Sequence, residues 1–176
     1  PLTLTRHPAD VRVLLDEVLE VAGRKAAIES VQVERRYAAD LPLARVDVAH
    51  LKTCFLNLVL NAVQAMPGGG TLRVTARRVA DPPSPAAGAA AGPGPEIEIA
   101  FEDTGAGIAP EDLPRVFEPY FTTKEVGIGL GLAMTRKIVE EHGGRILLTS
   151  QPGAGTRARL RLPPSSTALT TSSKRC

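Results

Sequence analysis

Two glycine clusters, at residues 105–107 and 127–131, constrain what this chain can fold into more than any other feature. The first cluster follows an apolar run that ends in the acidic residue Asp103, and the second opens a segment with helical spacing. Glycines at the start of a helix allow backbone N–H groups to approach an anion, and the helix dipole favours negative charge there. The pattern therefore predicts a phosphate-binding site, and it places Asp103 where it can bind another part of the same ligand.

The composition is typical of a soluble globular protein with one domain. The chain has 176 residues, of which 43% are hydrophobic and 23% are charged, and its net charge is +2. Such a small charge indicates no nucleic-acid partner, and no apolar run approaches the ~20 residues that span a bilayer. Because the chain begins at Pro1 without a methionine, we expect a fragment of a longer protein. Cys54 and Cys176 form no disulfide framework or metal-binding spacing, which suits a cytoplasmic location.

Hydrophobic periodicity predicts an α+β fold. Helical spacing predicts helices over residues 11–26, 48–65 and 129–142, and Asp10 and Asp47 are candidates to cap the first two. Alternating apolar residues predict strands over residues 31–37, 71–79, 96–102, 145–150 and 156–162. We expect a mixed sheet with the helices on one face, which is a two-layer α/β sandwich.

The segments between these elements carry turn and loop signals. Residues 40–46 are expected to be a connector, and residues 110–112 suit the first turn of a short helix. Residues 81–95 are rich in Pro, Ala, Gly and Ser, which predicts a flexible hairpin loop. Residues 164–176 are rich in Ser and Thr and are expected to form a disordered tail, so the folded domain should span residues 1–163.

The predicted helix over residues 48–65 is apolar on almost every side and should be largely buried. One face breaks the pattern, because polar or reactive side chains recur along it at His50, Cys54, Asn57, Asn61 and Gln64. Buried amides are costly unless they are paired. This face is therefore either a hydrogen-bonded stripe within the core or part of a binding site, and a buried, inert thiol is the simpler interpretation of Cys54.

Four short motifs follow one another along the chain. They are Asn57-Leu58-Val59-Leu60-Asn61-Ala62, Asp103-Thr104-Gly105-Ala106-Gly107-Ile108, Phe117-Glu118-Pro119-Tyr120-Phe121 and Gly127-Ile128-Gly129-Leu130-Gly131-Leu132. Together with His142-Gly143-Gly144 and the closing hairpin, they resemble the boxes of the ATP-binding catalytic domain of sensor histidine kinases, in the GHKL superfamily. The resemblance implies the Bergerat-type ATP-binding fold and the cofactors ATP and Mg²⁺. The short segment between Phe121 and Gly129 is similar to that of nitrogen-regulation sensors.

The resemblance also implies a role for individual residues. Asp103 would accept a hydrogen bond from the adenine 6-amino group. Gly105 and Gly107 would let the backbone pass close to the purine, and Asn61 would bind Mg²⁺ through its amide oxygen. The phosphates would contact the backbone N–H groups of Gly129, Leu130, Gly131 and Leu132. The other nucleotide contacts that the resemblance implies are Ile108, Phe117, Thr123, Lys124 and Gly127.

For Phe117, Phe121 and Lys124 the sequence leaves two alternative roles open, and at two further positions the chain departs from the family pattern. Phe117 and Phe121 either anchor a lid over the nucleotide or pack in the core. Lys124 either neutralises the terminal phosphate or is a solvated surface lysine. Many kinases of the family carry a basic and an aromatic residue where this chain has Gln64 and Ala65. The resemblance therefore implies no phosphate contact and no stacking partner for adenine at these two positions.

Asn57 distinguishes between branches of the superfamily. The ATP-hydrolysing branches carry a glutamate at this position, whereas an asparagine cannot act as a base at neutral pH. The resemblance therefore implies slow hydrolysis and phosphoryl transfer to a histidine. None of His7, His50 and His142 resembles the acceptor motif of the family, so the acceptor should lie on a separate dimerisation and phosphotransfer domain.

The expected partners are that domain and a response regulator, within a homodimeric parent protein that is either membrane-anchored or wholly cytoplasmic. Two other activities remain possible at this point. A serine kinase of the anti-sigma type shares the same boxes, and a nucleotide-sensing pseudokinase would bind ATP without transferring its phosphate.

Overall fold

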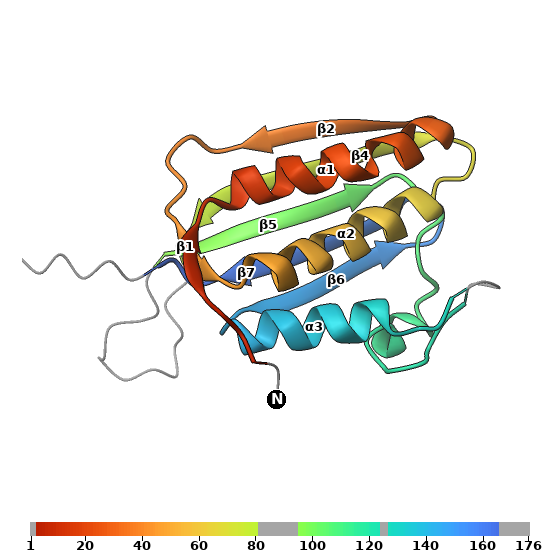
Figure 1. The fold of residues 1–176 in the computed structure, drawn as a ribbon. Helices are drawn as coiled ribbons and strands as arrows, with labels where there is room; N and C mark the ends of the chain where they lie inside the picture. Colours follow the sequence, from red (N-terminus) through yellow and green to blue (C-terminus); the bar gives the residue numbers. More distant parts are fainter. Residues whose placement is uncertain (1–2, 81–94, 124–126, 166–176) are drawn as a thin grey trace, which may run out of the picture.

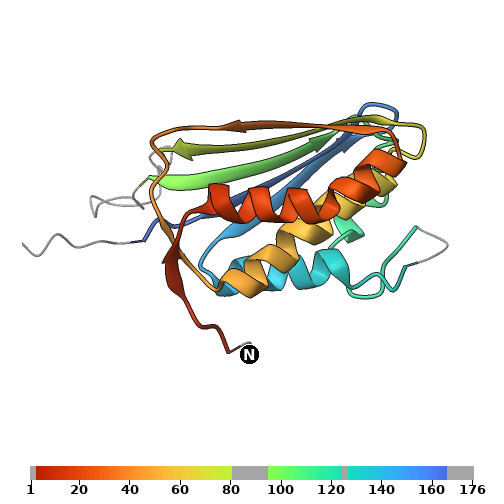
Figure 2. The same cartoon turned by 45° about the horizontal axis from the view of Figure 1, so that its top comes forward.

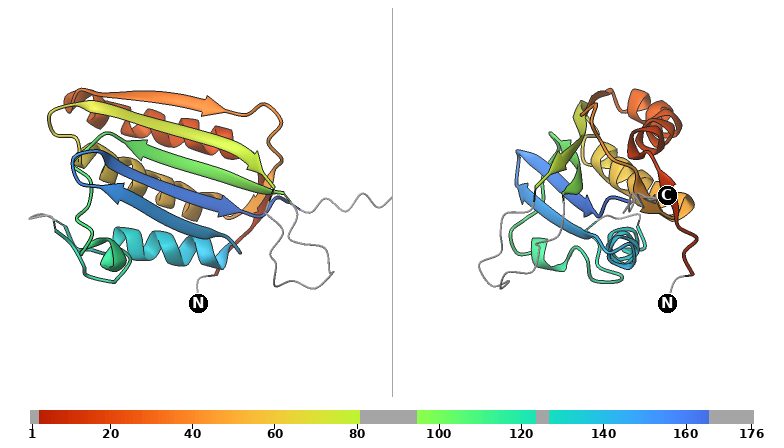
Figure 3. Two further views of the ribbon diagram at one scale, coloured as in Figure 1. Left: turned by 180° about the vertical axis from the view of Figure 1, so that it is seen from behind. Right: turned by 90° about the vertical axis from the view of Figure 1, so that its left-hand side faces the viewer.

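The computed structural model describes residues 3–80, 95–123 and 127–165, and it shows a sheet with helices on one face (Figure 1, Figure 3). The five-stranded sheet has the order β2-β4-β5-β7-β6, and β1 pairs with β3 in a separate two-stranded sheet. The predicted two-layer α+β sandwich with a mixed sheet is confirmed. Its elements are β1 (His7–Ala9), α1 (Val11–Ile28), β2 (Val31–Tyr37), β3 (Ala44–Val46), α2 (Val48–Gln64), β4 (Gly70–Val79), β5 (Glu96–Asp103), the 3-10 helix η1 (Leu113–Arg115), α3 (Gly131–Glu141), β6 (Arg145–Gln151) and β7 (Gly155–Leu162).

Strand pairing places β5 at the centre of the sheet. β2 and β4 are parallel, while β4, β5, β7 and β6 are antiparallel to their neighbours. The antiparallel pairing of β4 with β5 confirms the predicted hairpin, although residues 81–94 of its loop lie outside the described residues. Because β5 is central, the acidic residue at its C-terminal end, Asp103, is delivered beside the helices rather than to the edge of the domain.

The core lies between the helices and the sheet, and α1 and α2 lie against one face of the sheet (Figure 2). The ring of Phe55 on α2 lies 5.7 Å from the ring of Phe101 on β5, measured between centroids. Leu51, Phe55 and Val63 are each 0% exposed. The prediction that this helix is largely buried is therefore confirmed.

The connector before α2 contains more structure than its sequence predicts. Residues 40–46 include β3, which is too short to show an alternating pattern. The first two residues of the predicted tail, Pro164 and Ser165, also contact the folded domain. Pro164 bridges to Ala44, and the Ser165 N–H donates to the Leu43 carbonyl oxygen over 2.7 Å. The ordered chain thus continues past residue 163, and residues 166–176 lie outside the described residues.

Two helix boundaries also differ from the prediction. α3 begins at Gly131 rather than at residue 129, because Gly129 has a φ of 71°, which a right-handed helix cannot include. The helical turn expected at residues 110–112 forms later, as η1, with a proline in its first two positions.

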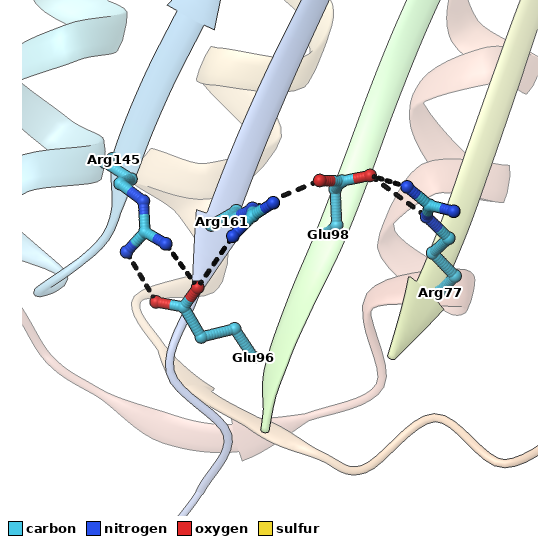
Figure 4. A network of polar contacts seen from close by, with 5 residues as sticks. All are labelled: Arg77, Glu96, Glu98, Arg145 and Arg161. Atoms are coloured by element: carbon cyan, nitrogen blue, oxygen red, sulfur yellow. Dashed lines mark hydrogen bonds and ion pairs between the residues drawn. The ribbon is translucent and has the colours of Figure 1, made fainter. Parts of the chain in front are cut away.

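An ion-pair network crosses the face of the sheet that the helices leave uncovered (Figure 4). Arg145 donates two hydrogen bonds of 2.8 Å to the carboxylate of Glu96. Arg77 donates two to Glu98, at 3.0 and 2.7 Å, and Arg161 lies 3.1 Å from Glu98 and 3.6 Å from Glu96. Burial raises the pKa of Glu98, but the guanidinium groups of Arg77 and Arg161 outweigh it, so this pKa lies below its usual value. The arginines therefore pair with two buried glutamates, Glu96 and Glu98.

Asp47 joins three segments at the N-terminus of α2. Its carboxylate accepts hydrogen bonds from the N–H groups of Thr5 and His50, at 2.8 and 3.1 Å. Its own N–H donates to Nε2 of the buried His142 over 2.9 Å, and Nδ1 of that ring lies 2.7 Å from the Ile138 carbonyl oxygen. One ring nitrogen accepts and the other donates, so His142 is the neutral Nδ1–H tautomer. The predicted capping role of Asp47 is confirmed.

We expect Asp47→Ala to lower the free energy of unfolding by about 1–2 kcal/mol, because α2 loses its N-cap acceptor. The His50 side chain holds the pKa of the Asp47 carboxyl well below its usual value. The ionised form therefore stabilises the fold above the unfolded-state pKa of about 4, and this contribution is lost as the pH falls below it. Asp47→Asn keeps one capping oxygen but loses the charge and turns an NH₂ group toward one of the two N–H donors, so only the pH-dependent part of its deficit reports the charge. Its deficit in chemical denaturation should narrow from pH 7 to pH 3, and a constant deficit would contradict the account.

Candidate nucleotide site

A cavity of about 590 Å³ opens beside the C-terminal half of α2, the end of β5 and the start of α3. Its floor is apolar and includes Leu58, Phe101, Leu148 and Ala158. Most of the residues predicted from the glycine clusters and the α2 stripe meet around it, namely Asn61, Asp103, Gly107, Ile108, Thr123, Gly127, Gly129, Leu130, Gly131 and Leu132. The fold thus gathers residues from all four sequence motifs at one place.

Asp103 is 7% exposed at the end of β5. Its Oδ1 accepts hydrogen bonds from the backbone N–H groups of Gly105 and Thr156, at 2.9 and 3.2 Å. Among the described residues, both hydrogen bonds to the Asp103 carboxylate go to Oδ1. Oδ2 can therefore accept a hydrogen bond from a ligand. Burial raises the pKa of Asp103 and outweighs the effect of the two N–H donors. The predicted ligand-binding carboxylate is therefore buried and held in a fixed orientation.

The glycines of the first cluster are required by the protein's own backbone. Gly105 does not line the cavity, and a Cβ there would lie 2.5 Å from the Ala65 carbonyl oxygen at the end of α2. Gly107 lines the cavity with a φ of 75°, and a Cβ there would collide with the Gln151 carbonyl oxygen. Gly105 thus allows close packing between α2 and the segment after β5, and its approach to a purine stays a prediction.

The second glycine cluster shapes the start of α3. A Cβ at Gly129 would lie 2.5 Å from the carbonyl carbon of Tyr120, whose N–H donates to the Gly129 carbonyl oxygen over 2.9 Å. Leu130 occupies the N-cap position, and no side chain caps the helix there. Gly131 and Leu132, in the first turn, line the cavity. The first N–H groups of a helix have no partner within the helix, and together with the helix dipole they suit the predicted anion site.

The polar stripe on α2 divides into two parts. Asn61 and Gln64, toward its C-terminal end, line the cavity. Asn57 lies outside the lining, and its Nδ2 donates to the Gly131 carbonyl oxygen over 3.4 Å, against the first turn of α3. Cys54 is fully buried, and burial raises the pKa of its thiol to about 12. The stripe therefore runs from the buried Cys54 to side chains that line the cavity, which agrees with a core position at one end and with a predicted binding role at the other.

The two aromatic residues of the third motif have different surroundings. Phe121 lines the cavity, and the guanidinium carbon of Arg115 lies 4.5 Å from its ring centroid. Phe117 lies outside the cavity lining and packs against the core, with Arg136 placed 5.5 Å over its ring. Of the two alternatives for Phe117, the structure agrees with packing in the core, and its contact with a nucleotide stays a prediction. Lys124 lies outside the described residues.

Two hydroxyl residues near the cavity were missed from the sequence. Thr156 lines the cavity, and its N–H binds Asp103. Ser150 lies behind the same wall and is bonded to Thr156. Their positions in the sequence could have indicated this location. Both residues flank the glycine turn of the predicted closing hairpin, which brings them to the same end of the sheet.

A buried carboxylate and a glycine-started helix without a side-chain cap thus meet at one cavity of a two-layer sandwich, as the sequence motifs predict. Residues 46–166 match the family model described as histidine kinase-, DNA gyrase B- and HSP90-like ATPase. The match covers more than half of the chain, so the chain belongs to this family.

Several proteins to which the chain is similar are sensor histidine kinases. The sensor histidine kinase ZraS of Escherichia coli (strain K12) is 36% identical over 163 residues, which are 93% of this chain and 32% of ZraS. Full-length ShkA in complex with AMPPNP is similar in structure, with a TM-score of 0.76 and 26% identity over 93% of this chain and 32% of ShkA. The mycobacterial sensor histidine kinase MprB gives a TM-score of 0.74 and 27% identity over 91% of this chain and 98% of that structure.

The chain thus spans about a third of the length of ZraS. In the part of the chain that the structure describes, no helix has both the length and the apolar character needed to cross a membrane.

Proposed function

We propose that this chain, from residue 1 to the end of β7, is the ATP-binding catalytic domain of a sensor histidine kinase. The observation that carries the proposal is one cavity that joins a buried carboxylate, Asp103, to the uncapped N-terminus of α3. A purine nucleotide offers a hydrogen-bond donor at one end and anionic phosphates at the other. Membership of the ATPase family and the AMPPNP complex of ShkA support ATP as the ligand.

The residues around the cavity suit the two ends of ATP. The Oδ2 of Asp103 would accept a charge-assisted hydrogen bond from the adenine 6-amino group. The apolar floor and Ile108 would pack against the base. The backbone N–H groups of Gly131 and Leu132 would bind the phosphates at the positive end of α3.

Asn61 fits a magnesium ion that accompanies the phosphates. Its amide oxygen is a hard ligand of the kind that Mg²⁺ prefers, and the residue lines the cavity. The described residues contain no group of three or more His, Cys, Asp or Glu side chains that could hold a metal ion. The ion would therefore be held mainly by phosphate oxygens and water, with Asn61 as the protein ligand. When bound, it would neutralise phosphate charge during transfer.

The proposed reaction is transfer of the γ-phosphoryl group to a histidine on a separate domain. The imidazole nitrogen attacks the γ-phosphorus, the bond to the β–γ bridging oxygen breaks, and ADP leaves. A neutral imidazole needs no strong base, and the amide of Asn57 cannot supply one to activate water. Catalysis would therefore depend on positioning, and hydrolysis by this chain should be slow.

The acceptor histidine would come from outside this chain. His142 is buried with both ring nitrogens bonded, and the Nδ1 of His50 lies 2.9 Å from Asp47. The proposed partners are a helical dimerisation and phosphotransfer domain of the same parent protein, which would be a homodimer, and a response regulator. The histidine kinase ThkA, to which this chain is similar in fold, has been solved in complex with the response regulator TrrA, which supports the second partner. The proposed site of action is the cytoplasm.

A phosphotransfer assay tests the proposal. The chain is incubated with γ-labelled ATP, Mg²⁺ and the helical domain encoded upstream of it in the parent protein. We expect label on the helical domain that is lost in acid and retained in base, which identifies phosphohistidine. Acid-stable label would indicate a serine kinase instead, and ATP binding without any transfer would indicate a pseudokinase.

A further inference from the structure

Ser150 lies near the end of β6, behind the wall of the cavity rather than in it. Its Oγ accepts a hydrogen bond from the Ile108 N–H over 2.8 Å and donates one to the Gly155 carbonyl oxygen over 2.9 Å. It also lies 2.8 Å from the Oγ1 of Thr156. Because Ile108 and Thr156 both line the cavity, this hydroxyl joins two parts of its wall.

The direction of each hydrogen bond follows from the number of hydrogens. A serine hydroxyl has one hydrogen and two lone pairs. The hydrogen of Ser150 goes to Gly155, and one lone pair goes to Ile108, so the other lone pair accepts the hydrogen of the Thr156 hydroxyl. The hydroxyl of Ser150 thus makes all three hydrogen bonds that it can make. The Thr156 hydroxyl has given its hydrogen to Ser150, so its Oγ1 can only accept a hydrogen bond from a further partner.

The turn between β6 and β7, which Ser150 stabilises, also contacts Asp103. The Thr156 N–H donates to Oδ1 of Asp103, and a Cβ at Gly155 would collide with the Asp103 carbonyl oxygen. On the other side of the turn, the Gly153 N–H donates to the Ala106 carbonyl oxygen over 2.7 Å. A shift of the turn would therefore move the Asp103 side chain.

We infer that Ser150 is a positioning residue for base recognition, which acts through Thr156 and Ile108 to fix the Asp103 carboxylate against the adenine edge of the nucleotide. The inference rests on the proposed function and adds a determinant of base specificity to it. Ser150 is hydrogen-bonded to residues at the adenine end of the cavity. Among the described residues it makes no hydrogen bond with α3, where the phosphates would bind. Loss of its hydroxyl should therefore weaken adenine recognition more than phosphate binding.

Displacement titrations of a fluorescent ATP analogue with ATP and GTP, both with Mg²⁺, test this inference. We expect Ser150→Ala to lower the affinity for ATP about tenfold while that for GTP changes less than about threefold. The preference for adenine should fall accordingly. Ser150→Thr keeps the hydroxyl and should retain most of the preference. Thr149→Ala removes a hydroxyl from the adjacent exposed position and should change neither affinity.

Hydrogen exchange at the Ile108 amide provides a readout that needs no nucleotide. It should be faster in Ser150→Ala than in the parent chain or Thr149→Ala, because the N–H loses its acceptor. Should Ser150→Ala fail to fold, Ser150→Cys takes its place and should show a smaller effect in the same direction, because a thiol is a weaker hydrogen-bonding group.

Two results would overturn the inference while leaving the proposed function intact. One is an unchanged adenine preference in Ser150→Ala. The other is an equal loss of ATP and GTP affinity together with a lower melting temperature, which would assign Ser150 a structural role only. If the parent chain itself does not displace the analogue with ATP, the proposed function fails instead.

Discussion

Asn61→Ala should reduce magnesium-dependent phosphotransfer to the helical domain by about 100-fold or more, the largest effect that we expect from one substitution. Asn61 lies on the buried α2 helix and lines the cavity near the first turn of α3. In the described residues, no cluster of acidic or histidine side chains is present that could replace it as a metal ligand. Without this amide, the metal and the phosphates it binds would lose their fixed position.

The prediction separates metal binding from nucleotide binding. The affinity for ATP without magnesium should change little in Asn61→Ala, whereas the gain in affinity on adding magnesium should disappear. Asn61→Asp keeps an oxygen ligand and should retain more transfer than Asn61→Ala. Full transfer by Asn61→Ala, or an unchanged response to magnesium, would show that Asn61 is not the metal ligand.

Asp103→Ala should weaken ATP binding by about 10- to 100-fold, which corresponds to ~1.5–3 kcal/mol. The buried carboxylate is fixed by the N–H groups of Gly105 and Thr156, so it is presented to the ligand without reorganisation. Asp103→Asn is the more informative variant, because it keeps the size of the side chain and an oxygen for those two donors. Its NH₂ group would then face the 6-amino group of adenine, and two donors cannot pair.

Calorimetry with ATP measures this effect directly. Asp40→Asn, at an exposed position outside the cavity lining, is the matched control and should bind ATP like the parent chain. Denaturation of Asp103→Asn should show whether the fold is retained. An unchanged affinity for ATP in a folded Asp103→Asn would remove the adenine-binding role from this residue.

Most helices and strands could be predicted from the sequence, because the capping residues and the hydrophobic periodicity agree with the elements that form. Asp10 and Asp47 cap α1 and α2 as predicted, and the strand spacing was correct for the main sheet. What escaped prediction depends on partners far apart in the chain. β3 pairs with β1 and also bridges to Pro164, and the buried Glu98 is paired with arginines from neighbouring strands.

The site could be predicted to the level of its motifs but not of its contacts. The sequence shows that Asp103 precedes a glycine cluster, and the structure adds that the carboxylate is oriented through Thr156. Gly105 and Phe117 belong to the motifs, yet they face the protein rather than the cavity. Spacing in a sequence does not reveal which side of a loop a residue faces, so these two assignments needed the three-dimensional structure.

The most direct test of the account is a crystal structure of this chain with AMPPNP and Mg²⁺. The account predicts the adenine 6-amino group within hydrogen-bonding distance of Oδ2 of Asp103. It also predicts the phosphates at the N–H groups of Gly131 and Leu132, with the metal bound by Asn61. A nucleotide bound elsewhere, or with its base and phosphates reversed in the cavity, would contradict it.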